Sequence, residues 1–348
     1  MNILITDSKK RLVGASLERA LSQLGYHCEL MTDDEGFRYD LFLALELSPF
    51  RRQAMSVRTL HKRTNGEQLK KRARAMGADL VIVIQGDYFL NSDIVTIQKD
   101  FEIPVVNWIV HDPALSEFFD PMRLGELAEY SHLFIADEAW LPGVYFFGKP
   151  VTYLPLAGDS EVFKPLVDTK KDIDIFFTGD LFPPSPGKTS GLVHARVLEG
   201  LLVKGFNVHA SVSGRAAMEK FVPMLKKLIV VRGRQTPESL NALYSRSKIV
   251  LTLFPLDYKK DATENFFNTA LSGSFQLVEQ KRNIEKSFSK SVVVFRSQEE
   301  LVELLSGYLK DAPAREASAA ALYDEVRRAH AYQERAAKLL ACIDVKLT

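Results

Sequence analysis

Short runs of β-branched and aliphatic residues alternate with amphipathic helical stretches along the chain, and this alternation limits the possible folds more than any other feature. Strands separated by helices form parallel sheets, because a parallel connection needs a long crossover. In the first half the pattern predicts strands at residues 3–6, 27–31, 41–44, 80–84, 105–109, 133–136 and 152–154. In the second half it predicts strands at residues 173–177, 207–210, 228–231, 249–253, 275–278 and 292–295. We therefore expect two doubly wound α/β domains.

The stretch between the two sets of strands predicts a domain boundary. Proline, glycine and charged residues gather there, between Pro155 and the charged run 168–172, which is typical of a linker. A chain of 348 residues also exceeds the size at which a single core stops growing. We expect a Rossmann-like domain at residues 1–157, a linker at 158–170, a second Rossmann-like domain at 171–331, and a C-terminal helix at 332–348 that can pack back on the first domain.

Composition excludes several classes of protein. The formal net charge of +1 argues against nucleic-acid binding, which needs a strongly basic surface. Cys28 and Cys342 are far apart and lack metal-type spacing, so neither a disulfide framework nor a zinc site is expected. No apolar run is long enough to cross a bilayer, and the N-terminus is typical of a strand and not of a signal sequence. These features predict a cytoplasmic protein.

Two nucleotide-binding motifs are absent, one of them in spite of a partial match. Gly187-Lys188-Thr189 lacks the glycine that a P-loop needs five residues before Gly187, where Phe182 stands, and prolines in between have no N–H groups for a phosphate. The first predicted strand is followed by no G-x-G-x-x-G sequence, so the dinucleotide fingerprint is missing.

A polar loop follows the predicted strand at residues 249–253 and leads into a helix that ends at Ser272-Gly273. In open α/β sheets, ligands bind beyond the carboxyl ends of the strands, where helix N-termini present free N–H groups. Polar side chains gather in this loop and helix: Tyr258, Lys259, Lys260, Asp261, Thr263, Glu264, Asn265 and Asn268. They suit a phosphorylated, hydroxyl-rich ligand, and a nucleotide sugar is the leading candidate.

Two interpretations are open at the start of this helix. Glu264, Asn265 and Asn268 can hold ribose or sugar hydroxyls, or Thr263 can cap a helix whose first turn is acidic. We favour a ligand contact for Asn268, because an amide on the inward face of a helix needs a hydrogen-bond partner.

Two more positions follow predicted strands of the second half. At Gly179 a ligand can approach the backbone, or the glycine forms an ordinary tight turn. At Arg232, Gly233 and Arg234, an arginine can stack on a base or bind a phosphate, or the segment is a solvated turn.

In the first half, His111 and Asp112 follow the predicted strand at residues 105–109. A proton acceptor for a sugar or protein hydroxyl is expected at such an edge, facing the cleft between the domains. Asp112 before Pro113 also forms a good turn, so a structural role is the alternative.

Basic residues crowd between Arg51 and Arg74, against the single acidic residue Glu67. They form either a solvated helical face or a surface that attracts an anionic acceptor or an anionic membrane. The sequence does not decide between these two interpretations.

Several segments of the second half, taken in order, resemble the CgeB-like (spore-maturation-protein-like) glycosyltransferases. The resemblance covers roughly residues 153–340, and four of its segments are Tyr153-Leu154-Pro155-Leu156-Ala157, Asp174-Ile175-Phe176-Phe177-Thr178-Gly179, Phe267-Asn268-Thr269-Ala270-Leu271-Ser272-Gly273 and His330-Ala331-Tyr332-Gln333-Glu334-Arg335. The last two are similar to the family patterns F-E-A-x-A-x-G and H-x-Y-x-x-R. One departure is that Asn265 and Asn268 stand where the family usually has arginine and glutamate.

The resemblance implies the GT-B fold, in which two Rossmann-like doubly wound domains face each other across a cleft. It implies a nucleotide-sugar donor bound mainly by the second domain, an acceptor facing the first domain, and no obligatory metal or other cofactor. Gly179 would line the phosphates or the sugar, residues 232–234 would border the base, and residues 263–268 would meet the pyrophosphate and ribose.

We therefore expect a hexosyltransferase-type enzyme that moves a sugar to a hydroxyl of a protein, glycolipid or surface polysaccharide. If the reaction inverts the anomeric centre, Asp112 or His111 is the expected base; if it retains, they position the acceptor. The two asparagines suggest an alternative, a catalytically silent GT-B-like protein that binds nucleotide sugars or serves in assembly. An epimerase or phosphorylase is a third alternative, although no clear pyridoxal-binding lysine is present.

Overall fold

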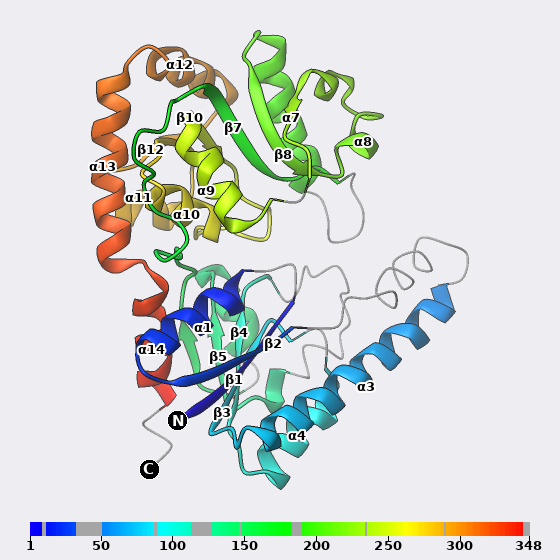
Figure 1. The fold of residues 1–348 in the computed structure, drawn as a ribbon. Helices are drawn as coiled ribbons and strands as arrows, with labels where there is room; N and C mark the ends of the chain where they lie inside the picture. The colour runs from blue at the N-terminus through cyan, green and yellow to red at the C-terminus, as the bar shows by residue number, and fades with distance from the viewer. Residues whose placement is uncertain are drawn as a thin grey trace. The chain divides into compact units, whose positions relative to one another are not determined.

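A computed structural model describes residues 1–8, 12–32, 51–86, 89–112, 127–145, 148–182, 190–233, 235–288 and 290–343, with only the backbone at 51–59. The chain divides into two compact units (Figure 1). Described residues of the first unit lie within Met1–Ala114, Phe119–Leu154 and Arg335–Thr348, and those of the second within Pro155–Glu334. The expected strand at residues 41–44 lies outside the described residues.

The first unit contains a parallel sheet which, within the described residues, has the order β2-β1-β3-β4-β5-β6. Its strands are β1 (Asn2–Asp7), β2 (His27–Thr32), β3 (Leu80–Ile84), β4 (Val105–Ile109), β5 (His132–Ile135) and β6 (Val151–Tyr153). Strands β3, β4 and β5 are buried along their whole length, which explains why they read as continuous apolar runs.

The helical elements of the first unit lie between and after these strands. They are α1 (Val13–Gln23), α3 (Arg51–Ala75), α4 (Asn91–Asp100), η1 (Leu127–Glu129), η2 (Glu138–Trp140), α6 (Leu141–Val144) and, from Arg335 onward, α14 (Tyr332–Ile343). The expected helix at residues 14–24 is therefore α1, one residue earlier at each end.

The second unit contains another parallel sheet, with the order β12-β11-β10-β7-β8-β9 in the described residues. Its strands are β7 (Ile173–Asp180), β8 (Val208–Ser213), β9 (Ile229–Val230), β10 (Ser247–Thr252), β11 (Gln276–Glu279) and β12 (Val293–Phe295). The first three strands run outward from β7 in one direction and the last three in the other. This is the strand order of the Rossmann fold, and it confirms the expected doubly wound α/β class.

Helices cover both faces of this second sheet. They are α7 (Ser190–Val203), α8 (Arg215–Met218), η4 (Pro223–Lys227), α9 (Pro237–Arg246), α10 (Glu264–Leu271), α11 (Arg282–Phe288), α12 (Gln298–Tyr308) and α13 (Ala312–Ala329). Neighbouring residues of β7 face opposite layers, as a strand requires. Phe177 joins the apolar cluster that includes Leu198 of α7 and Leu301 of α12, whereas the ring of Phe176 lies 5.9 Å from that of Tyr244 on α9.

Helix α10 is supported on its buried side by a close backbone approach at Gly158. The Gly158 N–H donates to the carbonyl of His330 at 3.0 Å, and the Tyr332 N–H donates to the carbonyl of Gly158 at 3.1 Å. A Cβ atom at Gly158 would lie 2.4 Å from Leu271 Cδ1 and 3.1 Å from the backbone carbonyl carbon of Phe267. The absence of a side chain at Gly158 therefore lets this segment pack directly on α10.

We predict that Gly158→Ala lowers the free energy of unfolding by about 1–3 kcal/mol, because the added methyl group overpacks a buried backbone contact. Urea unfolding of the full chain measures the effect. Gly307→Ala is the matched control in the same unit, since a Cβ at Gly307 in α12 meets no atom within 4 Å. This control should be neutral or stabilising by up to about 1 kcal/mol. Equal effects of the two substitutions would contradict the close-approach argument.

Candidate functional site

The candidate site lies at the carboxyl edge of the second sheet, where the winding of the chain reverses between β7 and β10. Ligands of open α/β sheets bind beyond such a switch point, because the loops leaving the two strands turn away in opposite directions. Gly179 and Asp180 form the end of β7, and residues 253–263 leave β10 and lead into α10. The polar loop that the sequence analysis predicted at the carboxyl end of a strand lies at this edge, between β10 and α10.

The loop between β10 and α10 is bound by three neighbouring elements. The Leu256 N–H donates to Ser190 Oγ at the start of α7 at 2.8 Å, and the Phe254 N–H donates to Glu279 Oε2 at the end of β11 at 2.9 Å. Asn283 of α11 donates from its backbone to the Lys260 carbonyl and from Nδ2 to Asp261 Oδ1, both at 3.0 Å. The loop is therefore preorganised by the protein itself.

His194 of α7 belongs to this edge, and the sequence analysis missed it. Its Nε2 lies 3.1 Å from the Phe254 carbonyl oxygen, and its ring packs edge-on to Phe177 with centroids 5.8 Å apart. Desolvation by burial lowers the pKa of the imidazole, and the Phe254 carbonyl and Glu279 partly oppose this shift. A neutral ring with its proton on Nε2 fits the contact. The only sequence signal for His194 at this edge is its position in the helix that follows the strand at residues 173–177.

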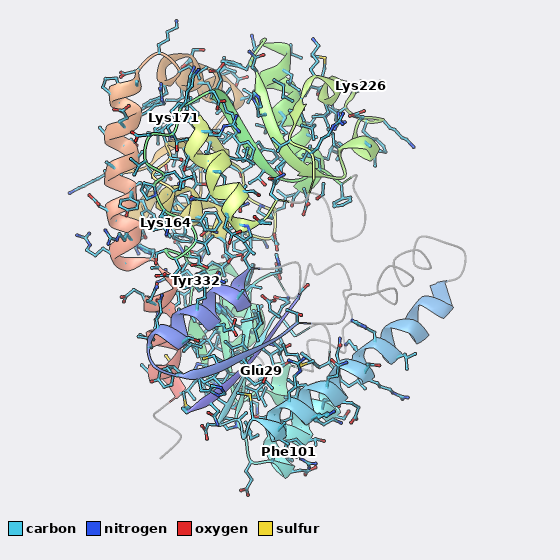
Figure 2. All side chains as sticks on the ribbon, in the orientation of Figure 1. Glu29, Phe101, Lys164, Lys171, Lys226 and Tyr332 are labelled. Carbon is cyan, nitrogen blue, oxygen red and sulfur yellow. The ribbon has the colours of Figure 1, made fainter. Side chains whose placement is uncertain are left out.

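The start of α10 differs from a conventionally capped helix. Thr263 is the N-cap residue in an extended conformation, but its side chain makes no capping hydrogen bond. The first-turn residue Glu264 accepts a 2.5 Å hydrogen bond on Oε1 from the hydroxyl of Tyr332, which is buried (Figure 2). Asn265 and Lys260 are partly exposed at the same edge. The structure thus brings Lys260, Thr263, Glu264 and Asn265 together.

Asn268 is buried, as expected from its inward position, and its partner belongs to the protein. Asn268 Oδ1 accepts a 3.0 Å hydrogen bond from the backbone N–H of Asp159. This contact supplies the partner that the sequence argument required and ties α10 to the segment preceding the second sheet. A contact of Asn268 with a ligand stays a prediction.

Of the other expected donor-site residues, Gly179 lies at the end of β7 beside β10, whereas Arg232 and Gly233 lie farther along the edge, after β9. Gly179 pairs with Val212 of β8, and a Cβ there would lie 2.9 Å from Phe177 Cζ. Arg232 and Gly233 are exposed after the edge strand β9, and Gln235 Nε2 donates to both carbonyls, at 3.3 and 3.0 Å. Gly233 has a φ of 85°. Arg234 lies outside the described residues, and β9 is separated from β10 by β8 and β7.

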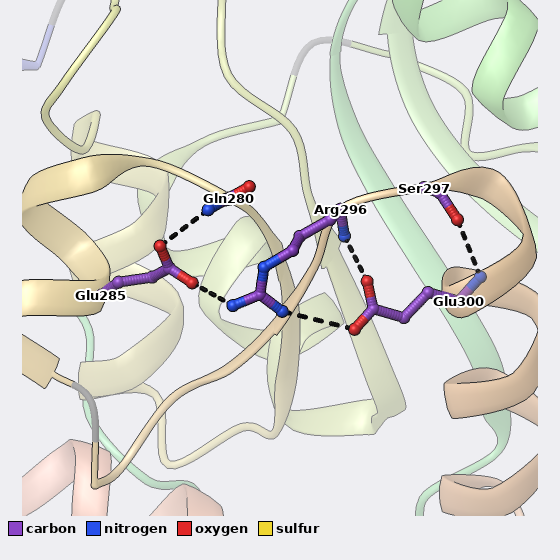
Figure 3. A network of polar contacts seen from close by, with 5 residues as sticks. All are labelled: Gln280, Glu285, Arg296, Ser297 and Glu300. Atoms are coloured by element: carbon purple, nitrogen blue, oxygen red, sulfur yellow. Dashed lines mark hydrogen bonds and ion pairs between the residues drawn. The ribbon is translucent and has the colours of Figure 1, made fainter.

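At the far end of the edge, beyond β11 and β12, Arg296 lies in a polar network (Figure 3). Arg296 contacts the carboxylates of Glu285 and Glu300, and its backbone N–H donates to Glu300 Oε2 at 2.7 Å. Gln280 Nε2 donates to Glu285 Oε2 at 2.8 Å, and Ser297 Oγ caps α12 by accepting from the Glu300 N–H. Two carboxylates surround this arginine, so its charge is already paired within the second unit.

In the first unit, His111 and Asp112 follow β4, as expected, with His111 partly exposed and Asp112 buried. The switch point of this sheet, beside β1, already holds a carboxylate. Asp7 Oδ2 accepts a 2.8 Å hydrogen bond from Gly14 N–H at the start of α1, and Oδ1 accepts from Ser8 N–H at 2.7 Å. This carboxylate disfavours a phosphate at the N-terminus of α1.

The basic segment 51–74 lies in α3. Several of its described charges have partners within the first unit. Lys70 pairs with Glu67 and Asp93, Arg72 pairs with Glu29, and the guanidinium of Arg74 lies 3.9 Å from the ring centroid of Phe101 (Figure 2 labels Glu29 and Phe101). These contacts involve the C-terminal part of the segment. The choice between a solvated helical face and a surface that attracts an anionic partner stays a prediction.

No group of three or more His, Cys, Asp and Glu side chains in the described part of the chain is arranged to hold a metal ion. Among the helices described, none has the length and apolar character that crossing a membrane requires.

Part of the chain matches a family of known proteins. Residues 192–341 match the family described as "Glycosyl transferase-like", a region that begins in α7 and includes the β10–α10 loop and α10. A comparison with curated proteins finds no match.

Solved structures resemble the whole chain. Sucrose-phosphate synthase from Thermosynechococcus elongatus matches with a TM-score of 0.70 and 11% identity, covering 99% of this chain and 98% of the other. A trehalose-6-phosphate structure from E. coli bound with UDP-2-fluoro glucose matches with a TM-score of 0.67 and 11% identity, covering 99% of both chains. A UDP-forming α,α-trehalose-phosphate synthase from Burkholderia xenovorans matches with a TM-score of 0.66 and 13% identity, covering 100% and 99%. At this level of identity they establish the GT-B fold class.

We predict that acidification destabilises the protein through His194. The folded-state pKa of His194 is lowered. Below the unfolded-state pKa of about 6.5, the unfolded chain therefore takes up a proton that the folded chain resists, and the free energy of unfolding falls as the pH falls. His194→Gln keeps an N–H donor for Phe254 but does not titrate, so its stability should decline less between about pH 7 and pH 5. Urea unfolding across this range tests it, and parallel pH dependences of the two proteins would refute it.

Proposed function

We propose that the chain is a glycosyltransferase that transfers a sugar from a nucleoside-diphosphate sugar to a hydroxyl group. The observation that carries this proposal is the position of the family match. It covers the preorganised loop and helix α10 beside the reversal of winding in the second sheet, where an α/β protein binds its ligand. The GT-B fold of the whole chain supports the same activity.

Donor binding is proposed for the carboxyl edge of the second unit. The positive end of the α10 dipole favours an anionic diphosphate, and Lys260 adds a cation in the loop that leads to the helix. The Thr263 hydroxyl makes no capping bond and is available for a phosphate or sugar oxygen. Because several hydrogen bonds already fix the loop, the departing diphosphate would be stabilised with little reorganisation.

The proposed acceptor is a hydroxyl of a protein, a glycolipid or a surface polysaccharide. In an inverting reaction, Asp112 or His111 would take the proton of this hydroxyl as it attacks the anomeric carbon; in a retaining reaction they would position the acceptor.

UDP is the first nucleotide to test, because one of the similar structures contains UDP-2-fluoro glucose. We further propose metal-independent transfer in the cytoplasm, with peripheral membrane contact through segment 51–74 if the acceptor is a lipid.

A second candidate, favoured by one observation, is a silent binding or assembly protein. Asn268 stands where the CgeB-like pattern has glutamate, and its Oδ1 already accepts a hydrogen bond from Asp159. A protein of this kind would bind nucleotide sugars without turnover. Any transfer activity that His111→Ala abolishes would eliminate this candidate.

We predict that the protein binds a nucleoside diphosphate and that Lys260→Ala weakens binding about 10-fold, because a charge-assisted contact to phosphate is lost. Isothermal titration with the diphosphates of uridine, guanosine, cytidine and thymidine measures this. Arg246→Ala is the matched control: Arg246 precedes β10 at the amino edge of the same sheet and pairs with Asp172. Failure of all four nucleotides to bind would contradict the proposed function.

We also predict that His111→Ala or Asp112→Asn lowers turnover by about 10²–10⁴-fold, the usual range for loss of a general base, while donor affinity is unchanged. Donor hydrolysis or transfer assays give the turnover, and titration gives the affinity. If neither substitution changes turnover in an active preparation, the assignment of the base is wrong.

A further inference from the structure

Gln85 has an unusual backbone conformation directly beyond β3 in the first unit. Its φ is 65°, in the left-handed region that residues with side chains rarely adopt. The residue is buried, with 2% of its surface exposed. Non-glycine residues in this region carry conformational strain, which persists only where the surrounding structure enforces it.

The side-chain amide of Gln85 binds the neighbouring chain just beyond β4. Its Oε1 accepts hydrogen bonds from the backbone N–H groups of Val110 and His111, both at 2.9 Å. Its Nε2 donates to the carbonyl oxygen of His111 at 3.3 Å. One amide therefore binds both the N–H and the C=O of His111, where β4 has ended and sheet hydrogen bonds are no longer available.

The surroundings hold Gln85 in this position. Its own N–H donates to the Trp108 carbonyl at 2.8 Å, and its carbonyl accepts from Asn107 Nδ2 at 3.3 Å. The next residue, Gly86, also has a positive φ of 86°, and a Cβ there would lie 2.7 Å from both Asn107 Nδ2 and the Tyr130 hydroxyl. Gln85 and Gly86 are thus closely packed against β4.

We infer that Gln85 is a positioning residue that fixes the backbone of His111 and so sets the placement of the His111 and Asp112 side chains. A glycine would adopt the same backbone conformation without strain. The hydrogen bonds of the side-chain amide are therefore what glutamine adds at this position. Fixing a backbone next to a proposed base matters because small displacements of a reacting group reduce the rate strongly. The predicted effect of Gln85 on turnover rests on the proposed function. The predicted effect of Gln85 on the position of His111 does not.

The test compares three variants of the full chain. Gln85→Gly removes the amide and relieves the backbone strain, so a loss of activity cannot be attributed to strain. Gln85→Glu keeps an acceptor for the two N–H groups but places a carboxylate oxygen opposite the His111 carbonyl. Gln68→Gly is the control for stability alone, since it introduces a helix-breaking glycine into α3 of the same unit.

We expect Gln85→Gly to lower kcat about 10-fold or more with the KM for the donor unchanged, and Gln85→Glu to have a smaller effect in the same direction. Gln68→Gly should change stability but not the kcat of the folded enzyme. In a background carrying both His111→Ala and Asp112→Asn, Gln85→Gly should lower kcat no further, because a residue that acts through these two side chains has no effect without them. Additive losses in this combined variant would overturn the inference.

A second readout does not depend on turnover. The protein has seven histidines, and His111 can be assigned in a proton–carbon NMR spectrum by the signal lost in His111→Ala. In Gln85→Gly, the His111 imidazole signal should shift or broaden while the other six are unchanged. An unaltered His111 signal would overturn the inference. If no turnover is found but the His111 signal responds, the proposed function fails and the positioning role stands.

Discussion

The hydrogen bonding of β7 to β8 on one side and to β10 on the other is the constraint on which the candidate site depends. Because the chain winds outward from β7 in both directions, the switch point falls at the carboxyl edge between β7 and β10, which is where open α/β sheets bind their ligands. The loop after β10 then meets α7, β11 and α11, each of which supplies a hydrogen-bonding group to it. The strand order decides where a ligand can bind, and these side chains decide how firmly the loop is held.

Helix α10 is fixed from its buried side. Asn268 binds the Asp159 backbone, Glu264 accepts a hydrogen bond from Tyr332, and Gly158 packs directly against the helix. A short helix of this kind has little stability of its own, since most helical stability in proteins comes from tertiary packing. Because these contacts fix the buried side of the helix, α10 keeps its first-turn N–H groups in one orientation. A charged ligand at this end would therefore meet dipoles that are already aligned, which is the property required of a site that stabilises a leaving diphosphate.

The sequence predicted most of the fold because buried parallel strands such as β3 and β4 are continuous apolar runs, which local patterns reveal. It also placed the polar loop and α10 at the correct edge. It could not predict that Asn268 binds Asp159 or that His194 contacts Phe254, because these pairs are 109 and 60 residues apart and depend on which strands become neighbours. Gln85 escaped notice for a related reason. Its sequence context, Ile84-Gln85-Gly86, indicates a turn but gives no sign that the side chain folds onto the next strand.

The isolated bridge between Gly158 and Ala331 also determines how the protein can be dissected. These residues lie just inside the two points, Leu154–Pro155 and Glu334–Arg335, at which the described chain passes from one unit to the other. A fragment intended to fold as the second unit alone must therefore include both, from Pro155 to beyond Tyr332. A shorter fragment would lose the Gly158 pairing and the hydroxyl that donates to Glu264, and with them two of the contacts on the buried side of α10.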